Sequence, residues 1–288
     1  MAEVDASGSL LRTIGEKKAT LGTNLKLSID ANLNQKVYDT LSAEIQKVEA
    51  KAGAAVAMDP RDGRILALTS YPSFDPNVLI AGADGQAIAQ TLTGEDKPLF
   101  SRVISGTYPP GSVFKIATSV AALESGRVKP DTKYVDNGQI FLGEFKFTNW
   151  YFTQYGKTEG EVDLVKALRR SNDTYFYQVA QALDEKIIGE YAKKLGLGSL
   201  TGIDLPGESP GLVPTNEWKK ANVGQIWYPG DTLHMAIGHG FVLVTPLQLA
   251  TMTSVIASNG TLFRPQIVTA QADESGKVIK DYPRNYCS

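Results

Sequence analysis

Cysteine and histidine are scarce in this sequence of 288 residues, which has one cysteine, Cys287, and two histidines, His234 and His239. A single cysteine excludes an intramolecular disulfide, and so few soft ligands argue against a structural zinc site. Long apolar runs are also missing, since no stretch reaches the roughly 18 apolar residues of a membrane-spanning helix. The acidic start lacks the apolar run of a signal peptide. We therefore expect this polypeptide by itself to carry no metal, no membrane anchor and no signal.

An excess of either charge is lacking as well. The 29 basic and 31 acidic residues leave a formal charge of −2. This balance excludes the basic groove of a nucleic-acid binder and a strong attraction to anionic membranes. With 42% hydrophobic and 21% charged residues, the composition is that of an ordinary globular protein with one large domain or two small ones.

The N-terminal third begins with a polar segment and continues with strand and helix patterns. Residues 1–24 are polar and punctuated by glycine, which is typical of a linker or the remnant of a preceding module. Residues 25–29 alternate like a short strand, and Asp30 is a suitable N-cap for the amphipathic helix that follows. The apolar runs 54–58 and 65–68 are joined by a Pro- and Asp-Gly-containing turn, which predicts a β-hairpin.

The remainder is dominated by predicted helices. The pattern predicts one helix over 112–123 and another over 164–183. The run Thr245–Gln248 is typical of a helix start, because its threonine can cap, its proline suits the first turn and its glutamine can complete a capping box. This last helix should run to Asn259. An early hairpin followed by helices predicts an α+β fold, with an antiparallel sheet and segregated helices.

The segment Pro109–Lys115 contains the first residues that could carry chemistry. If Ser112 opens a helix, Lys115 lies on the same face, and its amine can approach the serine hydroxyl. A desolvated lysine can take the proton of a serine, which is otherwise a poor nucleophile. A Ser-x-x-Lys run by itself also fits a plain helix cap followed by a surface lysine, so further motifs are needed.

A second polar motif lies downstream at Ser171 and Asp173. If they project from a tight turn at a helix start, the Ser171 hydroxyl could move a proton between Lys115 and a leaving group. The alternative is simple helix capping by the same two side chains.

Several further segments accompany these motifs in order. They are Val56–Ala67, Tyr71–Asn77, Trp227–Thr232, Ile237–Gly240 and Thr245–Gln248. Ser-x-x-Lys followed by a Ser-x-Asn-type element is a signature of penicillin-binding proteins and class A β-lactamases. From about Leu11 to Pro265 the chain resembles the transpeptidase domain of the penicillin-binding protein 2 family, which is class B and of the elongation type.

The resemblance implies a fold, a reaction and a set of roles. The fold would be that of serine β-lactamases and D,D-peptidases, with a sheet flanked by helices and an all-helical subdomain. Ser112 would attack the D-Ala-D-Ala carbonyl of a peptidoglycan stem peptide, with Lys115 as general base and Ser171 as proton relay. Asp173 would hydrogen-bond Lys115 or orient the substrate. β-Lactam antibiotics would acylate the same serine, and no cofactor is implied.

The resemblance also implies a cellular setting. The parent protein would act on the outer face of the bacterial cytoplasmic membrane. Its partners would be a membrane glycosyltransferase and proteins of the elongation complex, and not nucleic acid.

The sequence departs from the family pattern at its C-terminal side. No Lys-Thr-Gly or Lys-Ser-Gly follows Ser171, and the nearest run, Ser275–Lys277, has another order. In the family this motif supplies an oxyanion N–H and a cation for the substrate carboxylate. We therefore expect residues 25–288 to form a transpeptidase domain that is incomplete at its C-terminus, as a fragment or a frameshifted gene.

Other residues have simpler interpretations. His239 stands where relatives commonly have glutamine, which favours a packing role. The segment 145–166 has no His or Cys, so the zinc site of some relatives is not expected here. Tryptophans 150, 218 and 227 suit either a substrate groove or the core.

Two other functions remain open beside the transpeptidase. A β-lactamase would need a residue that activates water for deacylation, and no matching motif is present. A penicillin-binding sensor or scaffold that does not turn over remains compatible with the missing motif.

Overall fold

The computed structural model describes residues 2–7, 9–13, 22–80 and 84–283, so Cys287 lies outside the described residues. The chain divides into two compact units. The strand unit comprises the described residues up to Leu27 together with Val268–Pro283, and the main unit comprises Ser28–Ile267. Among the described residues, no helix has the length and apolar character needed to cross a bilayer.

The strand unit consists of short antiparallel strands. Strands β1 (Ala2–Val4) and β2 (Leu10–Thr13) pair with each other. Strands β3 (Asn24–Leu27), β10 (Val268–Ala272) and β11 (Val278–Asp281) form a sheet in the order β11-β10-β3. The short strand expected at 25–29 is therefore present, one residue earlier than predicted. The polar segment 1–24 contains two strands in its described part.

The first layer of the main unit is the predicted hairpin. Strands β4 (Gly53–Met58) and β5 (Ile65–Tyr71) pair antiparallel, with a register shift next to the turn. Helix α1 (Ala31–Lys47) packs against this hairpin, and α10 (Pro246–Ala257) packs against β4. The apolar side chains between these elements form the smaller core, which consists of Ile65, Val103, Ile104, Ile203, Leu247 and Ile267.

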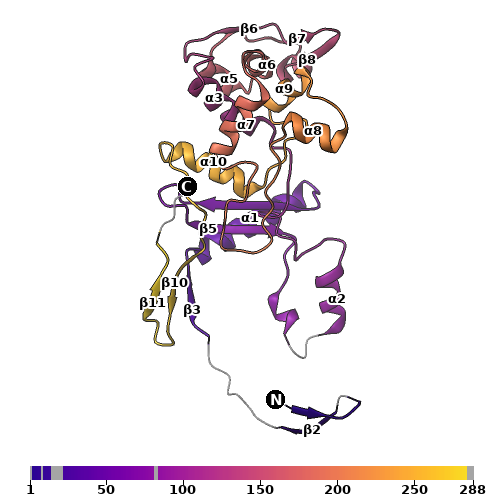
Figure 1. Ribbon diagram of the computed structural model, residues 1–288, viewed down its shortest axis with the longest axis vertical. Helices are drawn as coiled ribbons and strands as arrows, with labels where there is room; N and C mark the ends of the chain where they lie inside the picture. The colour runs from indigo at the N-terminus through magenta and orange to yellow at the C-terminus, as the bar shows by residue number, and fades with distance from the viewer. Residues whose placement is uncertain (1, 8, 14–21, 81–83, 284–288) are drawn as a thin grey trace. The chain divides into compact units, whose positions relative to one another are not determined.

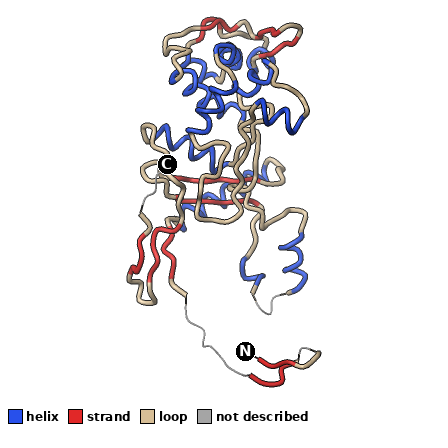
Figure 2. Tube along the Cα trace, viewed as in Figure 1, coloured by secondary structure: helices blue, strands red, loops and turns tan. Residues whose placement is uncertain are grey.

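The second part of the main unit is helical. Figure 1 looks almost along α6, with α3, α5, α7 and α9 around it and strands β6–β8 at its outer side. Buried aromatic residues such as Phe114, Tyr175 and Phe176 belong to the larger core that these elements enclose. Figure 2 shows the same division, with most of the helices above the hairpin and a smaller helical segment below it. The helices here are α3 (Lys115–Glu124), α4 (Trp150–Tyr155), α5 (Leu164–Arg170), α6 (Asp173–Ala182), α7 (Glu185–Lys194), α8 (Asn216–Val223) and α9 (Pro229–Ala236).

Short elements complete the main unit. They are the 3₁₀ helices η1 (Pro76–Leu79) and η2 (Gly111–Phe114), helix α2 (Gly85–Thr93), and the antiparallel pairs β6 (Tyr134–Asp136) with β9 (Gly160–Val162) and β7 (Gln139–Leu142) with β8 (Phe145–Thr148). The predicted class, antiparallel strands with segregated helices and a helical subdomain, is confirmed. The strands are distributed over several small sheets.

One predicted helix is wrong in a way that matters for the site. The pattern over 164–183 predicts a single helix, but the structure has α5 and α6 with a break between them. Ser171 ends α5 in the left-handed conformation, with φ of 50°, and the Asn172 side chain caps α6 by accepting from Tyr175 N. The apolar periodicity continues across the break, which is why the sequence pattern missed it. The break aims polar side chains away from the helix axis.

The predicted boundaries of α1 and α10 agree better with the structure. Thr245 and Gln248 form the expected capping box at the start of α10, and Asp30 caps α1. Helix α10 ends at Ala257, two residues before the predicted end. The expected apolar face of α1 is only partly buried, since Ile45 is its one buried residue and Val48 is exposed.

Candidate active site

The turn before α3 brings a serine to the surface. Pro110 leads into Gly111, which has φ of 56° and opens η2. Ser112 follows with an exposed side chain, while Phe114 and Lys115 point into the core. Ser112 thus lies in the first turn of a helical segment, where backbone N–H groups have no acceptor within the helix and can bind an anion.

The segment that follows α9, around Gly238, packs behind this turn. Gly111 N donates to Gly238 O at 3.1 Å. Gly238 has φ of 73°, and a Cβ there would come within 2.2 Å of Gly111 O and 2.6 Å of Phe114 Cβ. Only glycine permits this approach of two backbone segments. The position of Ser112 therefore depends on residues more than a hundred places away in the sequence.

Ser112, Ser171 and Lys115 form a chain of polar atoms. Ser171 Oγ lies 2.8 Å from Ser112 Oγ, and Lys115 Nζ lies 3.2 Å from Ser171 Oγ. The Ser112–Lys115 spacing predicts a direct approach of the amine to Ser112. In the described part of the chain, the hydrogen bonds of the amine instead go to Ser171 and Asp173, so its link to Ser112 runs through the Ser171 hydroxyl.

The Lys115 amine is buried and paired with one carboxylate. Lys115 Nζ lies 2.6 Å from Asp173 Oδ1 and 2.8 Å from the Ser171 carbonyl oxygen. Burial lowers the pKa of Lys115 below its ordinary value, and the charge and hydrogen bond of Asp173 oppose that change. The net direction is downward, so the amine loses its proton more readily than a surface lysine does.

The Asp173 side chain is itself held from a neighbouring helix. Its second oxygen accepts from Trp150 N at 3.0 Å, and its own backbone N–H donates to Asn149 Oδ1 at 3.2 Å. The Trp150 ring nitrogen donates to Arg170 O. Trp150 therefore contributes to the site through its backbone and indole N–H groups. Sequence reasoning gave no role to Asn149, although it precedes a helix whose start faces Asp173.

The remaining sequence candidates lie near the site or farther from it. A methyl group added at Gly111 would lie 4.0 Å from His239 Nε2, which places this exposed histidine beside the approach turn. Trp218 packs against Phe241 in a tilted arrangement, with ring centroids 5.4 Å apart, and the indole N–H of Trp227 donates to Thr232 Oγ1. None of these contacts joins the chain of polar atoms described above.

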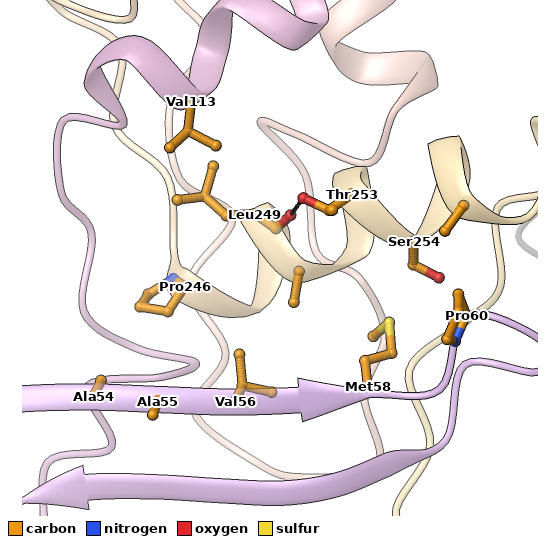
Figure 3. A pocket seen from close by; sticks show the side chains of 12 residues that line it. Ala54, Ala55, Val56, Met58, Pro60, Val113, Pro246, Leu249, Thr253 and Ser254 are labelled. Carbon is orange, nitrogen blue, oxygen red and sulfur yellow. Dashed lines mark hydrogen bonds between the residues drawn. The ribbon is translucent and has the colours of Figure 1, made fainter. Parts of the chain in front are cut away.

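An apolar groove of about 500 Å³ adjoins the serine turn. Figure 3 shows it between β4 and α10, with Val56 and Met58 on one wall and Leu249 on the other. Val113, the residue after Ser112, lines its end. Two hydroxyl groups lie among its lining residues: the Thr253 hydroxyl donates to Leu249 O, whereas the buried Ser254 hydroxyl has no hydrogen-bond partner within the described ranges of the chain.

The residues that the structure describes offer no cluster of three or more His, Cys, Asp or Glu side chains suited to a metal ion. An exposed hydroxyl, connected through a second hydroxyl to a buried amine of lowered pKa, is suited to nucleophilic attack on a carbonyl carbon.

Comparison with protein families gives a match over most of the chain. Residues 53–285 match the family described as penicillin binding protein transpeptidase domain. A curated relative, the peptidoglycan D,D-transpeptidase MrdA of Acinetobacter baumannii, is 35% identical over 283 residues. The match covers 98% of this chain but 40% of that protein, so the chain spans well under half of the relative's length.

Solved structures agree with the sequence comparison. Pseudomonas aeruginosa PBP2, crystallised with WCK 5153, is 36% identical with a TM-score of 0.78. The match covers 93% of this chain and 58% of the Pseudomonas chain. Helicobacter pylori PBP2, solved in complex with MreC, is 32% identical with a TM-score of 0.77. The match covers 94% of this chain and 49% of that one.

Proposed function

The chain belongs to the penicillin-binding protein transpeptidase family, and from this premise we propose that it carries the acyl-serine site of a D,D-transpeptidase that cross-links peptidoglycan stem peptides. The observation that carries the proposal is the chain Ser112–Ser171–Lys115, with Asp173 beside the amine. The relatives' names supply the substrate class.

Acylation begins with Ser112 Oγ, which attacks the carbonyl carbon of the penultimate D-alanine. The Ser112 proton moves to Ser171 Oγ while the Ser171 proton moves to the neutral Lys115 amine, along contacts of 2.8 and 3.2 Å. The tetrahedral oxyanion lies at the first turn of η2, where the Ser112 backbone N–H can stabilise it. The C–N bond then breaks, and the proton returns through Ser171 to the leaving amine of the terminal D-alanine.

Deacylation transfers the peptide to a second stem peptide. The amine of that peptide attacks the ester carbon, the C–O bond to Ser112 breaks, and the lost amine proton restores the serine hydroxyl. A β-lactam enters the first half of the same sequence, since opening of its ring by Ser112 Oγ leaves an acyl-enzyme whose amine cannot diffuse away.

A second candidate function is penicillin binding without turnover. The observation favouring it is that the printed sequence has no Lys-Thr-Gly or Lys-Ser-Gly after Ser171. The second oxyanion donor and the cation for the substrate carboxylate therefore have no assigned residue. In that case the site is acylated slowly and acts as a sensor or scaffold.

We further propose the setting of the longer family members for the parent protein. It would work on the outer face of the cytoplasmic membrane, together with a glycosyltransferase and elongation proteins. The support is the solved complex of Helicobacter pylori PBP2 with MreC.

The test is covalent labelling of the 288-residue chain with fluorescent penicillin, followed by mass spectrometry of the labelled peptide. We expect a stable adduct on Ser112, no adduct in Ser112→Ala, and normal labelling in Ser125→Ala. Ser125 lies at the far end of α3, and its hydroxyl donates to Ala122 O. Release of the label within minutes would indicate a β-lactamase instead. An unlabelled Ser112 in folded protein would exclude both the transpeptidase and the sensor.

Stem-peptide substrates separate the two remaining candidates. A transpeptidase releases D-alanine from a D-Ala-D-Ala peptide and joins the acyl group to an added amine. A sensor accepts the fluorescent penicillin and produces no D-alanine.

A further inference from the structure

A buried carboxylate, Asp136, lies behind the second motif. Asp136 ends β6 and is 1% exposed. Its Oδ1 accepts from Gly138 N and lies 2.7 Å from Thr174 Oγ1. Its Oδ2 accepts from the side-chain amides of Asn149 and Asn172 at 3.0 and 2.8 Å. A further donor to Oδ2 is Glu159 N at 3.0 Å.

All these donors are neutral groups. Gly138 is close to Asp136 in the sequence, and the others come from three further segments, at Asn149, at Glu159 and at residues 172–174. Asn149, Asn172 and Thr174 are 0% exposed, so their side chains have no water to replace a lost bond. Desolvation by itself raises the pKa of Asp136, but the hydrogen bonds together lower it by a larger amount. The net pKa is therefore below the ordinary range. The group is therefore a charged carboxylate at neutral pH, stabilised by hydrogen bonds.

The contacts of Asp136 surround the residues that face Lys115. Asn172 and Thr174 are the residues on either side of Asp173, and both bond to Asp136. Asn149 bonds to Asp136 through its NH₂ group and to Asp173 N through its carbonyl oxygen. The segment at the start of α6 is thus attached to Asp136 directly through Asn172 and Thr174, and its Asp173 N–H is attached through Asn149.

This attachment matters because the break between the helices is strained. Ser171 has φ of 50°, a conformation that residues with a Cβ adopt at a cost of order 1 kcal/mol or more. Its carbonyl oxygen and hydroxyl both contact Lys115 Nζ, and Asp173 supplies the third contact. A different path of the chain would move all three acceptors away from the amine.

We propose that Asp136 is a positioning residue for the acyl-transfer site, which holds Ser171 and Asp173 against Lys115 through Asn149, Asn172 and Thr174. The inference rests on the proposed function for its catalytic meaning. The arrangement itself also predicts how the titration midpoint of the Lys115 amine responds to substitution, which can be measured in the absence of substrate.

The experiment follows the titration of Lys115 by NMR. The chain is labelled with ¹³C at the lysine ε carbons, and the Lys115 signal is assigned by its absence in Lys115→Ala. Asp173 is the charged group that raises the pKa of the Lys115 amine, whereas burial lowers it. Loss of its close contact should therefore lower the titration midpoint.

The decisive variant is Thr174→Val, which keeps the side-chain shape and every charge. The Thr174 hydroxyl contacts Asp136 Oδ1 and Asn172 Oδ1, and not the Asp173 carboxylate. We expect the Lys115 midpoint to fall by about 0.5 pH unit or more, because a close opposite charge commonly shifts a pKa by about 1–3 units and part of that shift is lost. Asp136→Asn should lower the midpoint further.

The matched control is Asp59→Asn, another buried carboxylate in the main unit, located in the turn between β4 and β5 and bonded to Arg61. It should leave the Lys115 midpoint unchanged. Acylation by fluorescent penicillin should slow about tenfold in Thr174→Val and stay at the parent rate in the control, as expected for a group that tunes a general base.

Each outcome decides the proposal. An unchanged Lys115 midpoint in folded Thr174→Val overturns it, even if Asp136→Asn shifts, because the shift then comes from the lost charge alone. If Asp136→Asn does not fold, the Thr174→Val result stands by itself. If the parent chain titrates as expected but Ser112 takes no label, the proposed function fails and the positioning role of Asp136 is still judged by the Lys115 midpoints.

Discussion

Lys115 Nζ lies 2.6 Å from Asp173 Oδ1, in a pair whose side chains are 1% and 13% exposed. Burial lowers the pKa of this lysine, and the charge and hydrogen bond of Asp173 oppose that change. The pair is also attached to two different helices, α3 and α6, so it links the serine turn to the second motif.

Asp173→Asn should lower both stability and the pKa of Lys115. The amide keeps a hydrogen-bond acceptor but not the charge that offsets burial of the amine. We expect the free energy of unfolding to fall by about 2 kcal/mol at pH 7. This is less than the usual cost of an unpaired buried charge, because the amine can release its proton. Urea unfolding measures the loss, and it should shrink at higher pH, where the lysine is neutral in both states. A loss that stays constant with pH would contradict this explanation.

Ser171 should separate catalysis from backbone strain. Ser171→Ala and Ser171→Gly both remove the hydroxyl between Ser112 and Lys115, so each should reduce the acylation rate about a hundredfold or more. Their stabilities should differ, because φ of 50° suits glycine and strains alanine. We expect the glycine variant to be more stable by about 1 kcal/mol in urea unfolding. Equal stabilities would show that the break is not strained.

Gly238→Ala should displace the serine turn. Its Cβ would meet the Gly111 carbonyl oxygen and Phe114 Cβ, atoms that cannot move without shifting Ser112. We expect a loss of about 2–3 kcal/mol, from overpacking and a positive φ together, and acylation slowed more than tenfold. Gly224→Ala is the control, since its φ of 75° is similar but nothing lies within 4 Å of the added carbon. That variant should lose about 1 kcal/mol and keep the parent acylation rate.

Asp59 should contribute stability that disappears in acid. The hydrogen bond from Arg61 lowers the Asp59 pKa from 3.8 to about 2. A folded-state pKa below the unfolded value means that the stabilisation is complete above pH 3.8 and is lost as pH falls through about 2. Asp59→Asn should therefore destabilise by about 1 kcal/mol at pH 7, modestly because Arg61 is exposed. The melting temperatures of parent and variant should converge between pH 4 and pH 2, and a constant difference would contradict the assignment.

Much of the local structure could be predicted because local rules govern it. The caps of α1 and α10, the β4–β5 hairpin and the Ser112–Lys115 spacing all depend on residues within a few places of one another. The sequence also identified four side chains that the structure brings together, Ser112, Lys115, Ser171 and Asp173, while their catalytic roles stay a prediction.

The prediction from sequence was wrong where long-range contacts override a local helical pattern. The periodicity over 164–183 continues through Ser171, but the structure breaks the helix there. The competing interactions come from Asp136 and Asn149, which are 36 and 24 residues away from the residues that they hold. No local rule assigns them a role, because an aspartate before a turn and an asparagine before a helix are common in any loop.

By itself, then, the sequence determined the types and spacing of the reacting groups, the helix starts and the hairpin, since those follow from side-chain chemistry and from bonds between near neighbours. Only the tertiary structure decided that the amine reaches Ser112 through Ser171, that the amine is buried, and that a second carboxylate stands behind the motif. Burial and hydrogen bonding between distant segments set the protonation state of a group, and they exist only when the chain has folded.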